Sequence, residues 1–122
     1  MGLGIVLFSR LENWLDAFAL RIVSLYKYLT EKQHEYVMSK NVFTNGTEIG
    51  AYVKSAQDAE SKPIFYQEMG VAFRKALRTE YWLQLLHESG YLEAAAFESI
   101  HADCLELLRM LSAITKSTRQ SL

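Results

Sequence analysis

The sequence predicts an all-α protein, an antiparallel up-down-up-down four-helix bundle that forms one domain over residues 1–122. Hydrophobic residues make up 50% of the chain, which is enough to form one substantial core. In four segments, apolar residues recur at alternating spacings of three and four, as they do on one side of a helix. Short polar connections between these segments favour antiparallel neighbours. The expected helices cover roughly 10–30, 35–57, 62–89 and 93–117.

The first expected helix starts near Ser9. Ser9 and Glu12 have the spacing of a capping box, in which each side chain accepts a hydrogen bond from the other residue's backbone N–H. An apolar stripe follows, and the polar residues 30–35 end the helix. The stripe consists of Leu11, Leu15, Phe18, Ile22, Leu25 and Leu29.

The second expected helix contains two glycines, and Asn45-Gly46 is a dipeptide that often marks a tight turn. The apolar residues around it step by four and three instead of alternating, so the period is that of a helix. Each glycine inside a helix costs about 1 kcal/mol relative to alanine. We therefore expect Gly46 and Gly50 to be helix-packing sites, where a neighbouring helix approaches the backbone closely.

The third expected helix starts near Ser61, because a serine cap followed by Pro63 suits the first turn. Gly90 is placed as its C-terminal stop. The inner stripe of this helix is Phe65, Met69, Ala72, Ala76, Leu83 and Leu86. The stripe of the fourth expected helix is Phe97, Ile100, Cys104, Leu107, Leu111 and Ile114.

The composition excludes several classes of protein. The formal net charge is −1, so no overall field attracts the chain to nucleic acid or to an anionic membrane. Cys104 is the single cysteine and cannot form an internal disulfide, which fits a reducing compartment. No apolar run reaches the ~18 residues of a spanning helix. We expect a cytoplasmic protein without a membrane partner.

Two Glu-x-x-His pairs have the spacing that di-iron bundles use. The first pair, Glu31 and His34, falls in the first connection. The second pair is Glu98 and His101, and Glu98 points away from the apolar stripe of the fourth helix. The pairs are therefore expected to be solvated, with no metal bound. Glu80 borders an inner stripe and is expected to pair with a nearby cation.

No nucleophile elbow, phosphate loop or dinucleotide fingerprint occurs in the chain. Cys104 lies in a core stripe, where a thiol is neutral and inaccessible. We therefore expect no catalytic residue, no cofactor and no enzymatic activity.

The third helix carries two sets of residues outside its inner stripe. Ile64, Val71, Trp82 and Leu85 lie roughly 120 to 160° from the middle of that stripe, and we interpret them as a subunit interface. Two alternatives are scattered exposed residues and a Trp82 that folds back over a neighbouring helix. Arg74, Lys75 and Arg78 share one side and are a candidate nucleic-acid contact, although three cations usually form a solvated face.

Three segments carry a family resemblance: "RIVSLYKYL" (21–29), "NGTEIGAYVKSA" (45–56) and "ALRTEYWLQLLHESGYL" (76–92). They resemble the four-helix-bundle proteins first noticed as products of intervening sequences in bacterial 23S rRNA genes. In that family the second helix usually reads Leu-Arg-Ser-Gly-Thr-Ser-Ile-Gly-Ala-Asn. Residues 43–52 keep both glycines and Ile49 but replace the arginine, both serines and the asparagine.

The resemblance implies a homo-oligomer, a homopentamer in some members, with no established enzymatic activity. A related branch serves diversity-generating retroelements as an accessory protein that binds a reverse transcriptase and nucleic acid. Those accessory proteins are typically basic, unlike this chain. The first hypothesis is a non-enzymatic homo-oligomeric interaction or scaffold protein, and the alternative is a nucleic-acid-associated accessory protein that binds RNA, DNA or a reverse transcriptase.

Overall fold

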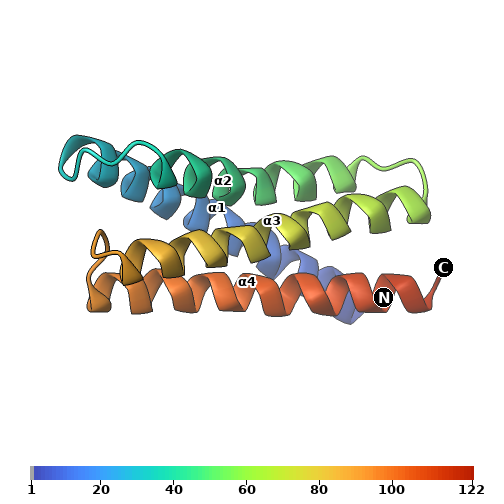
Figure 1. Cartoon of the computed structure of the whole chain (residues 1–122). Helices are drawn as coiled ribbons and strands as arrows, with labels where there is room; N and C mark the ends of the chain where they lie inside the picture. The colour runs from blue at the N-terminus through green and yellow to red at the C-terminus, as the bar shows by residue number, and fades with distance from the viewer. Residues whose placement is uncertain (1) are drawn as a thin grey trace.

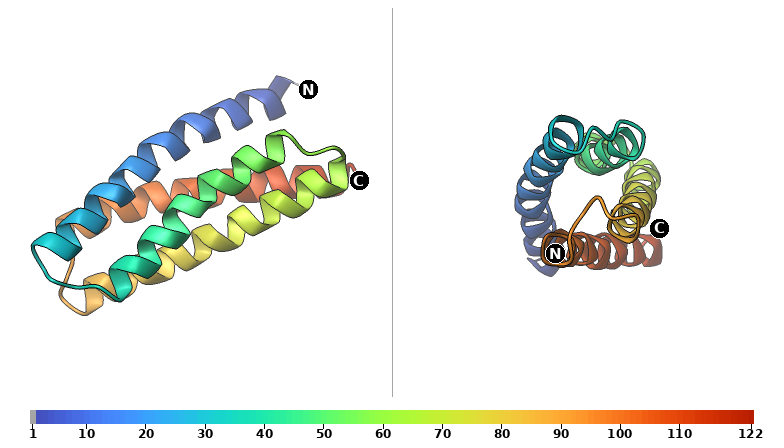
Figure 2. Two further views of the ribbon diagram at one scale, coloured as in Figure 1. Left: turned by 90° about the horizontal axis from the view of Figure 1, so that it is seen from above. Right: turned by 60° about the vertical axis from the view of Figure 1, so that its left-hand side comes forward.

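The structure, a computed structural model, describes residues 2–122, with side chains from Val6 onward. It contains four helices, α1 (Gly2–Glu31), α2 (Met38–Gln57), α3 (Lys62–Glu88) and α4 (Ala94–Gln120). Consecutive helices run in opposite directions, and both termini lie at the same end of the molecule (Figure 1). Seen along the axis, each helix lies between the two helices that it contacts (Figure 2). The predicted four-helix bundle is confirmed.

The core is built from one stripe of each helix, as the apolar periodicity predicts. Most stripe residues are at most 8% exposed. Phe65 and Phe97 are exceptions, because they lie at the edges of their stripes and are half-buried. Met110 and Leu92, which the stripes did not include, are also buried in the core.

The start of α1 differs from the prediction. The helix begins at Gly2, so Ser9 and Glu12 lie inside it and the predicted capping box is wrong. Phe8 packs against the core, with its ring centroid 6.0 Å from that of Phe65 in α3. The contact of Phe8 with α3 favours a helix that continues past Ser9 toward the N-terminus. The Glu12 carboxylate instead accepts a hydrogen bond from Nε2 of Gln57 in α2.

The ends of α3 follow its local sequence signals. The Ser61 side chain accepts a hydrogen bond from a backbone N–H of the first turn, where Pro63 lies. At the other end Gly90 has a φ of +88°, a left-handed conformation that glycine adopts without strain. The N–H of Tyr91 then donates to the carbonyl oxygen of Leu86 at 2.9 Å, which completes a Schellman-type stop.

Helix α2 begins at Met38, three residues later than predicted, and a buried carboxylate caps it. Glu35 accepts hydrogen bonds from the backbone N–H groups of Val37, Met38 and Ser39 at 3.1, 2.9 and 2.7 Å. Burial raises the pKa of the Glu35 carboxyl, but these hydrogen bonds together outweigh burial, so the pKa lies below its ordinary value. The charge also faces the positive end of the α2 dipole.

The two glycines of α2 differ in their surroundings. A Cβ on Gly46 would lie 2.9 Å from Cγ1 of the fully buried Ile22, so α1 packs directly on the α2 backbone there. A Cβ on Gly50 would have no other atom within 4 Å. Gly50 was predicted as a second packing site, but among the described residues no helix approaches its Cβ position, which faces a surface hollow between α1 and α2.

Alanine substitutions distinguish these two glycines. We expect Gly50→Ala to raise the free energy of unfolding by about 0.5–1 kcal/mol, because it gains helix propensity and meets no neighbour. Gly46→Ala is expected to show no such gain, and Gly46→Leu to cost about 1–3 kcal/mol through overpacking against Ile22. Chemical denaturation of the three variants measures these differences. Equal stabilisation by both alanines would contradict the close packing at Gly46.

Loss of the Glu35 cap should destabilise the fold. We expect Glu35→Ala to lower the free energy of unfolding by about 1–2 kcal/mol at neutral pH, with the exposed Glu60→Ala as a neutral control. The folded-state pKa of Glu35 is lower than the unfolded value of about 4.3, so its contribution is complete above that pH and is lost as pH falls through the folded value. Denaturant titrations at several pH values should therefore show the difference from wild type shrinking in acid. A difference that stays constant into strong acid would contradict this role.

Candidate functional site

The two Glu-x-x-His spacings do not bring potential metal ligands together in the described part of the chain. Glu31, His34 and Glu98 are all exposed, and His101 turns toward Glu80. Among the residues that the structure describes, no three His, Cys, Asp or Glu side chains gather closely enough to hold a metal ion. Glu31, His34 and Glu98 lie on the surface, whereas His101 is half-buried and engaged with Glu80, so the second pair is not fully solvated as predicted.

A stack of side chains joins the ends of α3 and α4. His101 Nε2 lies 3.0 Å from Oε2 of Glu80, so this carboxylate contacts a histidine ring of α4. The ring of Phe97 stacks between His101 and His87, with centroid distances of 4.8 and 4.5 Å. Nδ1 of His87 lies 2.8 Å from the carbonyl oxygen of Leu92. Both histidines therefore hold the two helices together.

Cys104 is fully buried, as predicted, and it is unsuited to nucleophilic chemistry. Burial, together with the negative charges of Glu80 and Asp103, raises the pKa of its thiol to about 12. Its Sγ lies 3.6 Å from the carbonyl oxygen of Ala76 in α3, to which the thiol donates. Cys104 thus serves as a small core residue that fixes the level of α4 against α3.

Of the three cations proposed as a nucleic-acid contact, Arg74, Lys75 and Arg78, one is engaged in an ion pair. Lys75 Nζ lies 3.5 Å from Oε2 of Glu48 in α2, so it is engaged in the α2–α3 contact. Arg74 and Arg78 are exposed. The structure therefore leaves two of the three cations open to solvent.

The predicted interface residues do not form an open apolar stripe. Ile64 is 41% exposed, whereas Val71, Trp82 and Leu85 are half-buried. Trp82 packs against the core, which is the arrangement in which it folds back over its own bundle. This set offers less free apolar surface than the sequence suggested.

Three other apolar side chains are exposed on α3 and α4, and sequence reasoning missed them. Leu77 and Tyr81 of α3 are 44% and 56% exposed, and Leu105 of α4 is 45% exposed. Ala76 of α3 contacts Cys104 of α4. Leu77 is the residue after Ala76 and Leu105 is the residue after Cys104, so the two leucines lie at about the same height along the bundle axis. We refer to Leu77, Tyr81 and Leu105 as the α3–α4 patch.

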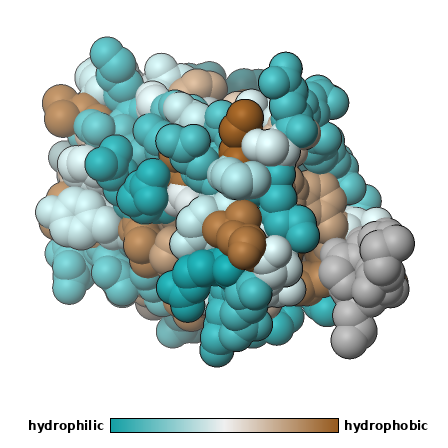
Figure 3. Space-filling model, turned by 90° about the vertical axis from the view of Figure 1, so that its right-hand side faces the viewer, coloured by the Kyte–Doolittle hydropathy of each residue, from teal (hydrophilic) through white to brown (hydrophobic). Residues whose placement is uncertain are grey.

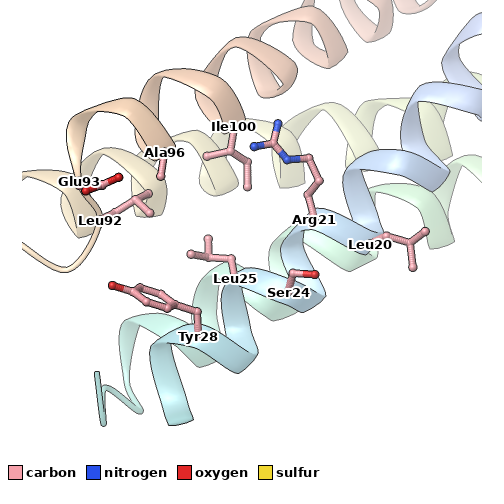
Figure 4. A pocket seen from close by; sticks show the side chains of 9 residues that line it. All are labelled: Leu20, Arg21, Ser24, Leu25, Tyr28, Leu92, Glu93, Ala96 and Ile100. Atoms are coloured by element: carbon pink, nitrogen blue, oxygen red, sulfur yellow. The ribbon is translucent and has the colours of Figure 1, made fainter. Parts of the chain in front are cut away.

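A groove opens between α1 and α4, at the end of the bundle where α4 begins (Figure 4). Leu25 and Tyr28 extend from α1 toward α4, and Leu92 and Ile100 extend in the opposite direction. The volume is about 710 Å³. We call this hollow the α1–α4 groove; the rest of its lining is Leu20, Arg21, Ser24, Glu93 and Ala96.

Polar contacts close one end of the α1–α4 groove. Nη1 of Arg21 donates to Oδ2 of Asp103 at 2.6 Å, and Nη2 donates to Oγ of Ser99 at 3.0 Å. Farther along, Nε1 of Trp14 donates to the carbonyl oxygen of Asp103 at 3.1 Å. This polar seam holds α1 to α4, and the groove begins where the seam ends, at Arg21.

The end of the molecule that carries the termini is different in character. In Figure 3 its visible described surface is mainly polar, with separate apolar side chains between the polar ones. No helix in the described part of the chain is both long and apolar enough to cross a membrane. The α1–α4 groove lies at the opposite end, where α4 begins.

The fold and these surfaces define a small helical bundle whose described histidine and cysteine side chains serve packing or lie exposed. Residues 10–113 match the family model described as 23S rRNA-intervening sequence protein, and the chain belongs to this family. The resemblance of the three sequence segments is thereby confirmed. A comparison with curated proteins found no match.

A similar solved structure supports the same assignment. It is the 1.70 Å crystal structure of a protein of unknown function from the S23 ribosomal protein family of Bacteroides thetaiotaomicron. The two sequences are 38% identical, and the structures superpose with a TM-score of 0.89. The match covers 90% of this chain and 98% of the other. The similarity therefore extends over nearly the whole bundle.

Proposed function

We propose that this protein is a non-enzymatic interaction protein that assembles from several copies of itself. The observation that supports this most is the exposed α3–α4 patch. Single exposed apolar residues are common on monomers, whereas Leu77 and Tyr81 are neighbours one turn apart on the same side of α3, and adjacent exposed apolar residues are typical of a protein contact. Tyrosine is also among the residues that most often dominate binding energy.

The polar side chains of the bundle are consistent with this proposal. Glu35 caps a helix, Glu80 contacts His101, and the Cys104 thiol is buried with a raised pKa. Nucleophilic and acid–base catalysis require such groups to be free to react. These side chains instead stabilise the fold, which leaves the molecular surface as the source of function.

The α3–α4 patch is a better contact surface than the set predicted from sequence. Ile64 is as exposed as a patch residue, but Trp82 and its other two companions already pack partly within the bundle. A second copy would therefore remove more apolar surface from water at the patch. The family resemblance suggests five copies, a number that the bundle itself does not specify.

Substitution in the patch tests the proposed assembly. We expect the wild type to form an oligomer at micromolar concentration, and Tyr81→Glu to shift it to the 14.0 kDa monomer because the contact would have to bury a charge. Val37→Glu is the matched control, since Val37 is 71% exposed and distant in sequence from the patch. Light scattering after size exclusion gives the masses. A monomeric wild type would disprove the assembly, and an oligomeric Tyr81→Glu variant would remove this tyrosine from the interface.

The alternative is that the protein binds nucleic acid through its exposed arginines. Arg74 and Arg78 supply two cations on one helix, and useful phosphate binding generally needs more. An accessory protein of this kind must shift structured RNA or single-stranded DNA in a gel at about 50 mM salt. We expect no shift from the wild type. A shift that Arg74→Glu with Arg78→Glu abolishes would reverse this ranking.

A further inference from the structure

We infer that the α1–α4 groove binds a small aliphatic amine, with its hydrocarbon chain on the floor of the groove and its ammonium group beside Glu93. The groove is formed within one chain, so this binding does not require self-association. A molecule of this class combines an apolar chain with one positive charge. The groove offers a counterpart to each.

The floor of the groove suits a hydrocarbon chain. Leu25 of α1 and Ile100 of α4 are 8% and 4% exposed, and Leu92, just before α4, is 5% exposed. All three line the hollow, and their side chains extend into the space between the two helices (Figure 4). A ligand chain on this floor would leave water together with the remaining exposed surface of the three residues, which favours binding.

The groove has the size of a small-molecule site. Its volume of about 710 Å³ lies within the range of about 300–1,000 Å³ that is usual for ligand pockets. On α1 it runs from Arg21 to Tyr28, about 10 Å along the helix. Ser24 on α1 and Ala96 on α4 line it with small side chains. A short alkyl chain can therefore reach the floor without displacing a large residue.

The two ends of the groove differ in charge, because its charged lining residues are Arg21 and Glu93. Arg21 donates to Asp103 at 2.6 Å and to Ser99 at 3.0 Å, so its positive charge is compensated within the protein. Glu93 is exposed, and no ion pair within the described residues involves it. Its side chain makes no capping hydrogen bond to α4. The uncompensated charge of the lining is therefore negative.

This charge distribution selects an amine among apolar ligands. An aliphatic amine is positively charged at neutral pH and is attracted by the Glu93 carboxylate. A carboxylate of the same length would be repelled there, and at the other end it would meet a guanidinium already paired with Asp103. Because Glu93 lies on the exposed rim, the ammonium group keeps part of its hydration. Binding therefore buries no unpaired charge.

Tyr28 lies at the same end of the groove as Glu93, and Arg21 lies at the other end (Figure 4). The Tyr28 hydroxyl accepts a hydrogen bond from Nε2 of Gln33 at 2.6 Å, which restrains the ring. The face of an aromatic ring attracts cations. An ammonium group at this end can therefore be stabilised by the tyrosine ring as well as by the carboxylate.

Probes of equal chain length test the charge preference of the groove. Hexylamine, hexanol and hexanoate are titrated into isotopically labelled wild-type protein, and the NMR shifts of the Leu25 and Ile100 amides give the dissociation constants. We expect hexylamine to bind in the millimolar range, about two- to fivefold more tightly than hexanol, and hexanoate to bind most weakly. The inference is overturned if hexylamine causes no saturable shift of these amides, or if hexanoate binds as tightly as hexylamine.

Neutralisation of Glu93 tests the proposed position of the ammonium group. Glu98→Gln is the matched control for Glu93→Gln, because Glu98 is exposed on the same helix and does not line the groove. We expect Glu93→Gln to remove the advantage of hexylamine over hexanol and to leave hexanol binding unchanged, whereas Glu98→Gln keeps the advantage. An advantage that persists in Glu93→Gln would contradict the contact with this carboxylate.

Filling the groove tests the location of the hydrocarbon chain. Ser24→Trp and Ala96→Phe fill it from opposite helices, with Ser24→Ala as the control, and circular dichroism checks that the variants keep their helices. We expect both filling variants to lose hexylamine binding. Undiminished binding by either folded variant would place the amine elsewhere. A wild type that binds hexylamine but is monomeric by light scattering would remove the proposed assembly and leave this inference standing.

Discussion

The close contact between Gly46 of α2 and Ile22 of α1 sets the arrangement of the first helix. Without a side chain at Gly46, α1 packs directly on the α2 backbone, with Ile22 fully buried. The opposite flank of the same turns of α1 faces α4, and there the helices are joined by Arg21 and then separate. Helix α1 therefore packs tightly on α2 along one side and leaves the groove open toward α4 along the other.

Polar and apolar side chains have separate tasks in this bundle. Polar groups hold elements together, as Glu35 does at the start of α2 and Arg21 does between α1 and α4. No buried side-chain nitrogen or oxygen atom of the described residues lacks a hydrogen-bond partner. Several apolar residues, among them Leu20, Val37 and Tyr81, remain exposed outside the core. The buried polar groups therefore serve the fold, and the exposed ones remain in contact with solvent.

The sequence by itself determined the features that depend on local chemistry. The alternating spacing of three and four between apolar residues predicted which side of each helix faces the core. Residues on these sides, such as Leu11, Leu83 and Leu107, are fully buried. Ser61 and Gly90 marked the ends of α3, because caps and left-handed glycines act within a single turn. The buried, unreactive state of Cys104 also followed from its place in a stripe.

Only the tertiary structure decided the features that depend on neighbouring helices. Ser9 and Glu12 have capping-box spacing, yet packing of Phe8 against α3 carries the helix past them. Gly46 and Gly50 lie one turn apart, but only Gly46 meets another helix. Periodicity places a residue around the axis of its own helix, and it does not report the distance or rotation of the next helix. The exposed flank of α3 and the groove beside α1 both depend on that distance and rotation.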